Sequence, residues 1–347
     1  MVTWRGRRFE DDVNCRSILA LVAILTALVP AAGHAQPSIT WTGGVVGGGW
    51  DTISRGMAEL ISEKTGFLVR VLQGGAAQNP VRVEKGDADI GMGMPPLLGA
   101  ATRGEDPYAG RKMEHLRALA GNMSLNVFHL YVATDLSLAN LTMDQIFQSR
   151  APIRLAISRP GTADIWVLEK IMAYYGLCAA DKRADCYKGW EMLGARFFRG
   201  TYTEQAAAFK RRRVDSTFAF LALPAAAVTE ASHGRRLTLL PFSQPLLDYL
   251  ATFGLAAGVI PAGTYPLASN ADSNVASATM GTTITISTRM SEDLAYLLTR
   301  TINDNVDRVR KMHESMADYD PSRGYVNLGV PLHPGAERYY REKGWLQ

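Results

Sequence analysis

The sequence lacks the residue patterns on which most catalytic and metal sites depend. It contains no H-E-x-x-H, no G-x-S-x-G and no C-x-x-C motif, which excludes the common patterns of zinc proteases, serine hydrolases and thioredoxin-like proteins. The histidines beyond residue 35 are scattered, without the spacing of paired metal ligands. The sequence therefore offers no recognisable catalytic or metal-binding cluster.

Long hydrophobic runs are absent except near the beginning of the chain. Residues 18–29 form an apolar run of about 12 residues, followed by Pro30 and by small residues up to Ala35. This pattern predicts a secretory signal peptide over residues 1–35, with cleavage after Ala35. The mixed charges that precede the run leave two alternatives open, a misassigned translation start and a twin-arginine export route. No later segment reaches the roughly 18 uninterrupted apolar residues of a membrane-spanning helix.

Cysteine is scarce, with three residues in the whole chain. Cys15 lies in the predicted signal peptide, which leaves Cys178 and Cys186. Two cysteines close in sequence in an exported chain favour a disulfide that closes a short loop. A metal site is the alternative, but only Asp181 and Asp185 lie nearby as further ligands.

Charge of neither sign dominates. The formal net charge is +4, and it falls to +3 without residues 1–35, which carry four arginines and three acidic residues. Residues 210–213 form the only dense basic run, and no aromatic residue interrupts it. A solvated helix end explains this run better than a nucleic-acid site, so no nucleic-acid partner is expected.

Strand-like and helical patterns alternate along the rest of the chain, as in α/β proteins. A strand at residues 39–42 is followed by a glycine-rich turn and a helix over 51–64. A second unit of this kind has its strand at 153–157 and its helix at 163–175. A long helix is expected over 291–315. Two such units predict two lobes whose helix N-termini flank a crevice, and helix N-termini bind anionic groups through their unpaired N–H groups.

Three features near the expected crevice each have two interpretations. The glycine run at residues 43–49 fits neither a Walker phosphate loop nor a G-x-G-x-x-G motif, so it is either a tight turn or a direct ligand contact. Trp50 either stacks on a ligand or covers the first helix. Arg159 either clamps a carboxylate with its planar guanidinium or is an ordinary surface arginine.

Four segments, in this order along the chain, resemble the TAXI family. These segments are residues 47–50, 84–91, 260–266 and 331–340, and the last two are the most specific. TAXI proteins are the extracytoplasmic solute receptors of tripartite ATP-independent periplasmic (TRAP) transporters. The resemblance covers nearly the whole chain beyond residue 35.

The resemblance implies an α/β chain with a type II periplasmic-binding-protein fold. Such a fold has two lobes, with a mixed sheet and flanking helices in each, joined by a hinge of crossing strands. On this pattern we expect the first part of lobe 1 over residues 36–130 and lobe 2 over 131–245. Residues 246–347 are expected to return to lobe 1 and to supply the hinge and the C-terminal helices.

The resemblance also implies a function, and it implies no cofactor and no catalysis. The protein is expected to be a monomeric periplasmic receptor that captures a small organic anion between its lobes and delivers it to a membrane-embedded TRAP permease. Two alternatives stay open on the sequence: an exported binding module that feeds a sensor, and an enzyme built on the same fold. A neighbouring permease gene would favour the first interpretation, and turnover of the bound compound would favour the enzyme.

The expected ligand-binding residues come from the loops at the beginnings of helices. They are Gly48, Gly49, Trp50, Asp51, Gln78, Asn79, Met94, Arg159, Gly161, Thr162 and Phe220. The chain departs from the family pattern at residues 94–96, which read Met-Pro-Pro, and at residues 158–162, which include Arg159. Fewer polar donors, an added cation and an added apolar wall predict a carboxylate with an apolar or aromatic body.

Overall fold

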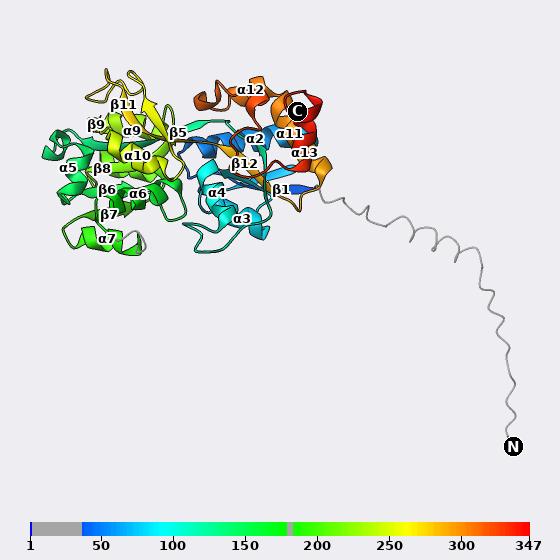
Figure 1. The fold of residues 1–347 in the computed structure, drawn as a ribbon, viewed down its shortest axis with the longest axis horizontal. Helices are drawn as coiled ribbons and strands as arrows, with labels where there is room; N and C mark the ends of the chain where they lie inside the picture. Colours follow the sequence, from blue (N-terminus) through cyan, green and yellow to red (C-terminus); the bar gives the residue numbers. More distant parts are fainter. Residues whose placement is uncertain (2–36, 179–182) are drawn as a thin grey trace. The chain divides into compact units, whose positions relative to one another are not determined.

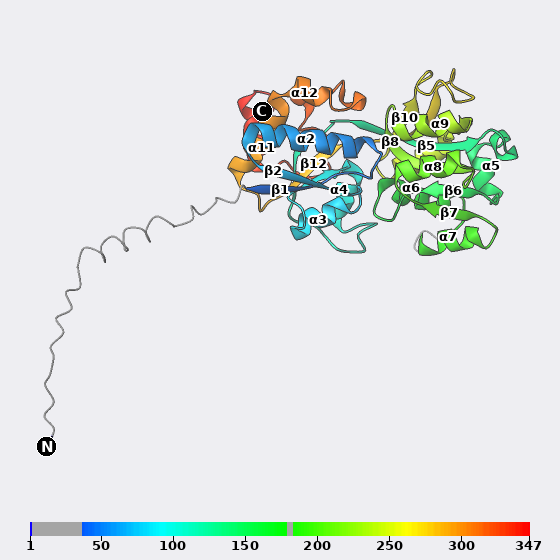
Figure 2. The ribbon, with the colours of Figure 1, turned by 180° about the vertical axis from the view of Figure 1, so that it is seen from behind.

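The computed structural model describes Met1, residues 37–178 and residues 183–347. The expected signal peptide, its cleavage point after Ala35 and Cys15 lie outside these residues. Residues Pro37–Gln347 form one compact unit. Within it, two mixed sheets are each covered by helices, and they form two separate groups of elements in Figures 1 and 2.

The first sheet has five strands in the order β2-β1-β3-β12-β4. Its strands are β1 (Ser38–Thr42), β2 (Leu68–Leu72), β3 (Ile90–Gly93), β4 (Leu116–Ala120) and β12 (Thr283–Ser287). Strands β1, β2 and β3 are parallel, whereas β12 runs antiparallel to β3 and β4. The helices of this first lobe are α2 (Gly49–Thr65), α3 (Asn79–Lys85), α4 (Pro95–Arg103), α11 (Glu292–Asp304), α12 (Val306–Arg310) and α13 (Pro334–Glu342), with the short turns η2 (Glu314–Met316) and η3 (Pro321–Arg323).

The second sheet has seven strands, in the order β10-β11-β5-β8-β6-β7 with β9 beside β5. Its strands are β5 (Leu125–Ala133), β6 (Arg154–Ile157), β7 (Arg196–Arg199), β8 (Ser216–Ala222), β9 (Leu237–Leu239), β10 (Ala256–Ile260) and β11 (Val275–Gly281). Only the β6 pairings with β7 and β8 are parallel. The helices of this second lobe are η1 (Ser137–Asn140), α5 (Met143–Gln148), α6 (Ala163–Tyr174), α7 (Arg183–Glu191), α8 (Tyr202–Lys210), α9 (Ala226–Gly234) and α10 (Gln244–Ala251).

The chain crosses between the two sheets twice. It passes from β4 to β5 through residues 121–124, and it returns from β11 to β12 through Thr282 alone. The Thr282 hydroxyl is fully buried and accepts hydrogen bonds from Asn126 Nδ2 (3.1 Å) and Trp50 Nε1 (2.8 Å). The expected fold class, two α/β lobes with a mixed sheet in each, is therefore confirmed. The lobe boundaries implied by the resemblance, after residues 130 and 245, stay a prediction.

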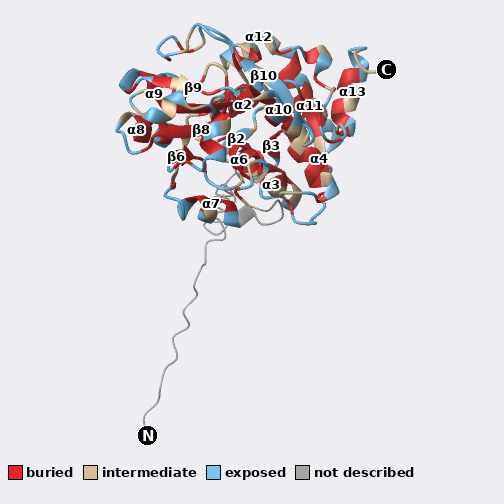
Figure 3. Ribbon diagram, turned by 60° about the vertical axis from the view of Figure 1, so that its left-hand side comes forward, coloured by how far each residue is buried: buried red, intermediate tan, exposed pale blue. Residues whose placement is uncertain are grey.

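Helix α2 shows why the local sequence folds as it does. Ile53, Met57 and Leu60 recur at helical spacing and are fully buried, so this face packs against β2. The helix ends at Gly66, whose φ of 76° lies in the left-handed region that glycine adopts without a Cβ clash. In Figure 3, buried residues lie on most of the strands and on one face of many helices, whereas strand β10 is largely exposed.

The expectation of one long helix over residues 291–315 is wrong. Helix α11 ends at Asp304, and Asn305 leaves the helical region with φ −107° and ψ 34°. The Asn305 side chain donates to Thr301 O at 2.8 Å. Asparagine side chains compete in this way for backbone groups, which favours helix ends over helix interiors. The chain continues as the separate short helix α12.

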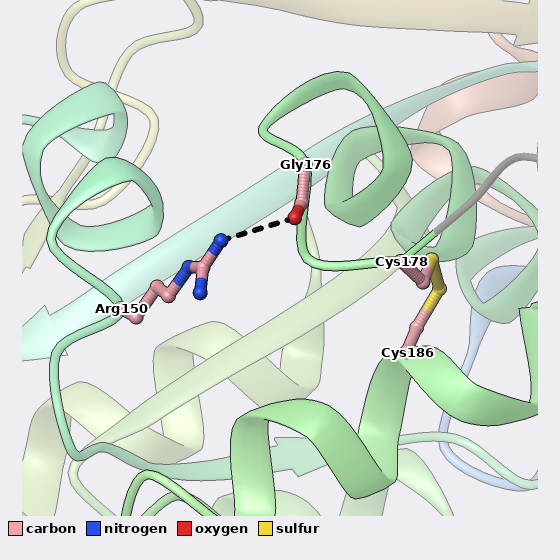
Figure 4. Close-up of a disulfide and its surroundings, with 4 residues drawn as sticks. All are labelled: Arg150, Gly176, Cys178 and Cys186. Atoms are coloured by element: carbon pink, nitrogen blue, oxygen red, sulfur yellow. Dashed lines mark hydrogen bonds between the residues drawn. A yellow bond between two sulfur atoms is a disulfide. The ribbon is translucent and has the colours of Figure 1, made fainter.

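The two cysteines beyond the expected signal peptide form a disulfide. Cys178 follows α6 and Cys186 lies within α7, so the bond ties α7 to the end of the preceding helix (Figure 4). Next to it, Arg150 Nη2 donates to Gly176 O at 3.2 Å. Cys186 is fully buried, so the bond lies against the core of the second lobe.

Within the described ranges, no helix combines the length and the hydropathy needed to cross a membrane.

Replacing both cysteines, as Cys178→Ser with Cys186→Ser, should lower the free energy of unfolding by about 2–3 kcal/mol, because the disulfide restricts the unfolded chain. Urea denaturation of the two proteins measures this difference. Reductant should lower the stability of the wild type by a similar amount and leave the double variant unchanged. Equal stability of both proteins under oxidising conditions would contradict the prediction.

Candidate functional site

Two helices from opposite lobes begin at the same cavity. Helix α2 of the first lobe begins at Gly49, and α6 of the second lobe begins at Ala163. The cavity between them measures about 30 Å³, which is room for one or two water molecules. It is lined by Gly44, Val45, Gly48, Gly49, Trp50, Gly75, Ala76, Met94, Asn126, Thr162, Ala163, Tyr202, Phe220 and Ala222.

Backbone N–H groups without an acceptor line this cavity. None of the described residues accepts a hydrogen bond from the N–H of Gly49, Trp50 or Ala163. These three groups belong to the first turns of α2 and α6, where a helix offers no internal acceptor. The helix dipoles add partial positive charge at the same points. The backbone alone therefore makes this cavity suitable for an anionic group.

The rest of the cavity wall is largely apolar. The side chains of Trp50, Met94 and Phe220 are 7%, 3% and 5% exposed. The Trp50 ring is held in place by its hydrogen bond to Thr282 at the crossing between the lobes. Phe220 packs on Phe128, with ring centroids 4.2 Å apart. A ligand in this space would place its anionic end at the helix starts and its body against these side chains.

Two glycines of the first lobe, Gly49 and Gly75, allow its backbone to lie close to the second lobe. A Cβ at Gly49 would lie 2.7 Å from the Ala222 Cβ of the opposite lobe, and a Cβ at Gly75 would lie 2.5 Å from Gly161 O. Real Cβ atoms do not come this near to other heavy atoms. The glycine-rich loops thus bring bare backbone of the first lobe against the second lobe.

Backbone hydrogen bonds join the lobes at this contact. The N–H groups of Ala77 and Gln78, in the first lobe, donate to Gly161 O of the second lobe at 3.1 and 3.0 Å. Gly161 has a φ of 96°, a conformation that residues with a side chain rarely adopt. The described conformation is therefore closed at this edge of the cavity.

A second contact between the lobes involves a buried lysine. Asp106 of the first lobe accepts hydrogen bonds from Trp166 Nε1 (2.9 Å) and Lys170 Nζ (3.0 Å), both on α6. The Lys170 ammonium lies 3.8 Å from the Phe253 ring centroid and 4.5 Å from that of Trp166. Burial lowers the pKa of Lys170 to about 8. The aspartate and the two rings together stabilise a cation that has little access to water.

Asp164 follows Ala163 of the cavity wall, in the first turn of α6. It is 1% exposed, and burial raises its pKa from 3.8 to about 6. The hydroxyls of Ser158 and Thr162 and the N–H groups of the first turn oppose that rise. This carboxyl therefore competes with any ligand for the positive end of α6 when it is ionised.

The structure brings six of the eleven expected ligand-binding residues together at the cavity. These six are Gly48, Gly49, Trp50, Met94, Thr162 and Phe220. Asp51 lies in the first turn of α2, but its carboxylate forms an ion pair with Arg55 at 3.0 Å. Gly161 contributes the carbonyl that joins the lobes.

Asn79 has a different role in the structure from the one expected. It is fully buried, and its amide donates to Gly43 O (2.9 Å) and Met92 O (2.8 Å). Its side-chain oxygen accepts from Thr42 Oγ1 (2.8 Å) and from Gly75 N (3.0 Å). All of its hydrogen-bonding capacity is thus used to shape the loop, and it does not line the cavity.

Two other expected residues, Gln78 and Arg159, lie at a neighbouring cavity of about 270 Å³. This second cavity shares Val45 and Thr162 with the first.

Sequence reasoning missed several residues of the wall, notably Asn126 and Tyr202. Tyr202 begins α8, and its hydroxyl donates to Phe220 O at 3.0 Å. Burial raises the pKa of Tyr202 far above its ordinary value, so the phenol stays neutral. Thr201, just before it, forms a capping box with Glu204, which marks the start of a helix in sequence but not its nearness to a cavity.

Among the residues with described positions, no group of three or more His, Cys, Asp or Glu side chains is arranged to hold a metal ion.

Comparison with known proteins gives one family and many distantly similar structures. The model of the NMT1-like family matches residues 41–344. A solved structure of iron-bound HitA from Pseudomonas aeruginosa has 13% identity and a TM-score of 0.47, covering 89% of this chain and 99% of that one. A solved structure named "Putative L-Cystine ABC transporter from Listeria monocytogenes" has 13% identity and a TM-score of 0.45, covering 82% of this chain and 98% of that one. A TRAP periplasmic solute-binding protein from Sulfitobacter sp. NAS-14.1 with bound β-D-galacturonate has 11% identity and a TM-score of 0.41, covering 88% of this chain and 93% of that one.

Replacing Asp164 with Asn should change how stability depends on pH. Because the carboxyl has a higher pKa folded than unfolded, the native state binds a proton between pH 4 and 6, and the wild type loses stability as pH rises through this range. Relative to the wild type, Asp164→Asn should gain up to about 3 kcal/mol between pH 4 and pH 7. Urea denaturation at both values tests this, with the exposed Asp87→Asn as control. A constant difference across the range would contradict the prediction.

Replacing Gly49 with Ala should keep the lobes from closing fully, because the new methyl group would overlap Ala222. The free energy of unfolding should stay within about 1 kcal/mol of the wild type, since each lobe can fold unchanged. Small-angle X-ray scattering should show a larger radius of gyration. The control is Gly99→Ala on α4, where the added Cβ meets only the flexible end of Arg103. Identical scattering of Gly49→Ala and the control would argue against this role.

Proposed function

The chain belongs to the NMT1-like family, and we propose that it is a periplasmic solute-binding receptor that closes its two lobes on a small organic anion. The anion is a carboxylate, and the receptor delivers it to a TRAP-type permease. The lobes bind and release the ligand without chemical change.

One observation carries this proposal. The unpaired N–H groups of Gly49 and Trp50 in one lobe and of Ala163 in the other line a single cavity. Helix N-termini are general binding sites for carboxylate and phosphate groups. A ligand that contacts both lobes shifts their equilibrium toward the closed form, which is how a hinged receptor signals that it is loaded.

The wall of the cavity supports a ligand with an apolar body. Trp50, Met94 and Phe220 offer it no charged group. The small volume of about 30 Å³ means that the lobes must separate slightly around a bound acid, or that the acid extends into the neighbouring cavity of about 270 Å³. Either arrangement keeps the carboxylate at the helix starts, beside the N–H groups of Gly49, Trp50 and Ala163.

The proposed TRAP partner rests on the two segments that most resemble TAXI proteins. In the segment at residues 260–266, the Tyr265 hydroxyl accepts from Ala225 N at 3.0 Å and lies 2.8 Å from His129 Nε2, inside the second lobe. In the segment at 331–340, which includes most of α13, Tyr340 is fully buried and donates to Leu119 O at 3.2 Å. Both segments therefore have structural roles that a family pattern would preserve.

Native mass spectrometry of the protein as purified, followed by a thermal-shift screen of carboxylic acids, tests the proposal. We expect a co-purified small acid, or an acid that raises the melting temperature by several degrees. At 100 times its dissociation constant, a ligand adds about 2.7 kcal/mol of stability. Neutral amides of the same acids serve as controls and should give no shift. If amino, keto, dicarboxylic and aromatic acids all fail to bind, the carboxylate assignment is wrong.

A further inference from the structure

The cavity of about 270 Å³ has an arginine from each lobe in its wall. Arg82 comes from α3 of the first lobe, and Arg159 comes from the turn between β6 and α6 of the second lobe. The cavity adjoins the first one, since Val45 and Thr162 line both. It therefore lies beyond the helix starts, toward the surface where Arg159 is exposed.

Neither guanidinium is neutralised by a carboxylate. Arg82 Nη1 donates to Thr42 Oγ1 at 2.8 Å and to Gln73 O, both uncharged. Within residues 37–178 and 183–347, Arg159 makes no side-chain hydrogen bond and neither arginine forms an ion pair. The residues that line the cavity include no acid. Arg159 contributes to lowering the pKa of Glu204, but this carboxylate forms no ion pair with Arg159 and accepts a hydrogen bond from Thr201 N at 2.7 Å.

Two cations that share a cavity without a counterion repel each other when the lobes close. An oxyanion between them would replace that repulsion with attraction on both sides. The guanidinium group has the planar, forked geometry that suits carboxylate, sulfate and phosphate oxygens. Since the two arginines belong to different lobes, an anion bound by both would favour the closed form specifically.

We propose that Arg82 and Arg159 form an oxyanion subsite across the two lobes, distinct from the helix starts of the first cavity. Its occupant is an oxyanion, which is either the second acidic group of the transported ligand or a free inorganic anion. The first source rests on the proposed function, because it requires an organic acid bound at the helix starts. The second source does not.

Matched pairs of acids test the subsite. Calorimetric titration at low ionic strength compares glutarate with pentanoate and adipate with hexanoate, so that each pair differs only in its second carboxylate. The diacid should bind about tenfold more tightly, a difference of 1.4 kcal/mol. Arg159→Gln should remove this preference, so that each diacid binds no more tightly than its matched monoacid. Sodium sulfate, compared with sodium chloride at equal ionic strength, tests the free anion by thermal shift.

Arg82 needs a second variant because its hydrogen bonds also support the first lobe. Arg82→Gln should remove the diacid preference, whereas Arg82→Lys keeps the charge and should retain part of it. The controls are Arg70→Gln and Arg211→Gln, which each remove one exposed positive charge from a lobe away from the cavity. Both controls should keep the full preference.

The outcomes separate this subsite from the proposed function. Sulfate stabilisation that Arg159→Gln abolishes supports the subsite with a free anion as its occupant, even if no organic acid binds. Monoacid binding without any diacid preference or sulfate effect overturns the subsite and leaves the receptor function intact. An equal loss of preference in the control variants also overturns the subsite, because the effect would then be one of net charge. If none of the probes binds, both proposals fail.

Discussion

The backbone N–H groups at the start of a helix must find an acceptor, and in this protein two helices begin where no described residue supplies one. The first turns of α2 and α6 leave such groups along the wall of one cavity. The lobes can close on this cavity only if an acceptor enters with the ligand or if water remains there. The glycine loop lets the two lobes lie close together, apolar side chains line much of the cavity, and the crossing at Thr282 holds the Trp50 ring in place.

The two helix starts are not equivalent. At α6, Asp164 lies in the first turn itself, buried and with its pKa raised. At α2, Asp51 lies in the first turn but pairs with Arg55 instead. The α2 start therefore has less competing negative charge close to the cavity. A carboxylate in the cavity should interact more strongly with Gly49 and Trp50 than with Ala163.

Two hydrogen-bonded contacts join the lobes, and only one of them involves charged groups. In one contact, the Gly161 carbonyl accepts hydrogen bonds from two backbone N–H groups. In the other, the Asp106 carboxylate accepts hydrogen bonds from Trp166 Nε1 and Lys170 Nζ. Hydrogen bonds to a charged group contribute more than neutral ones, so the second contact is the stronger of the two. Its position on the body of α6 means that closure engages the whole helix and not only its first turn.

The strength of a local pattern explains which elements the sequence predicts. Helix α2 has an apolar face at helical spacing and a terminating glycine, and it was predicted almost to its ends. Strands β10 and β11 were missed because Ala256–Ile260 and Val275–Gly281 are rich in alanine, glycine and small polar residues, which carry little strand signal. They form at one side of the second sheet because β11 pairs with β5 and β10 pairs with β11, which is a tertiary effect.

The residues of the site also differ in whether a local sequence pattern indicates them. Loop residues next to a predicted helix start, such as Gly49 and Thr162, could be named from the sequence because helix capping is local. Arg82 and Tyr202 could not be named, since nothing in their own segments indicates that a cavity lies beside them. Asn79 shows the converse, because its loop was identified but its buried amide is used to build the loop.

The sequence by itself determined the alternation of strands and helices, the glycine-rich turns and the likeness to a receptor family, because these depend on neighbours along the chain. Only the tertiary structure decided which helix starts face each other, which arginines share a cavity and where the chain crosses between sheets. Those features depend on how two lobes close around Thr282, and no periodicity within a segment records the distance between residues of different lobes.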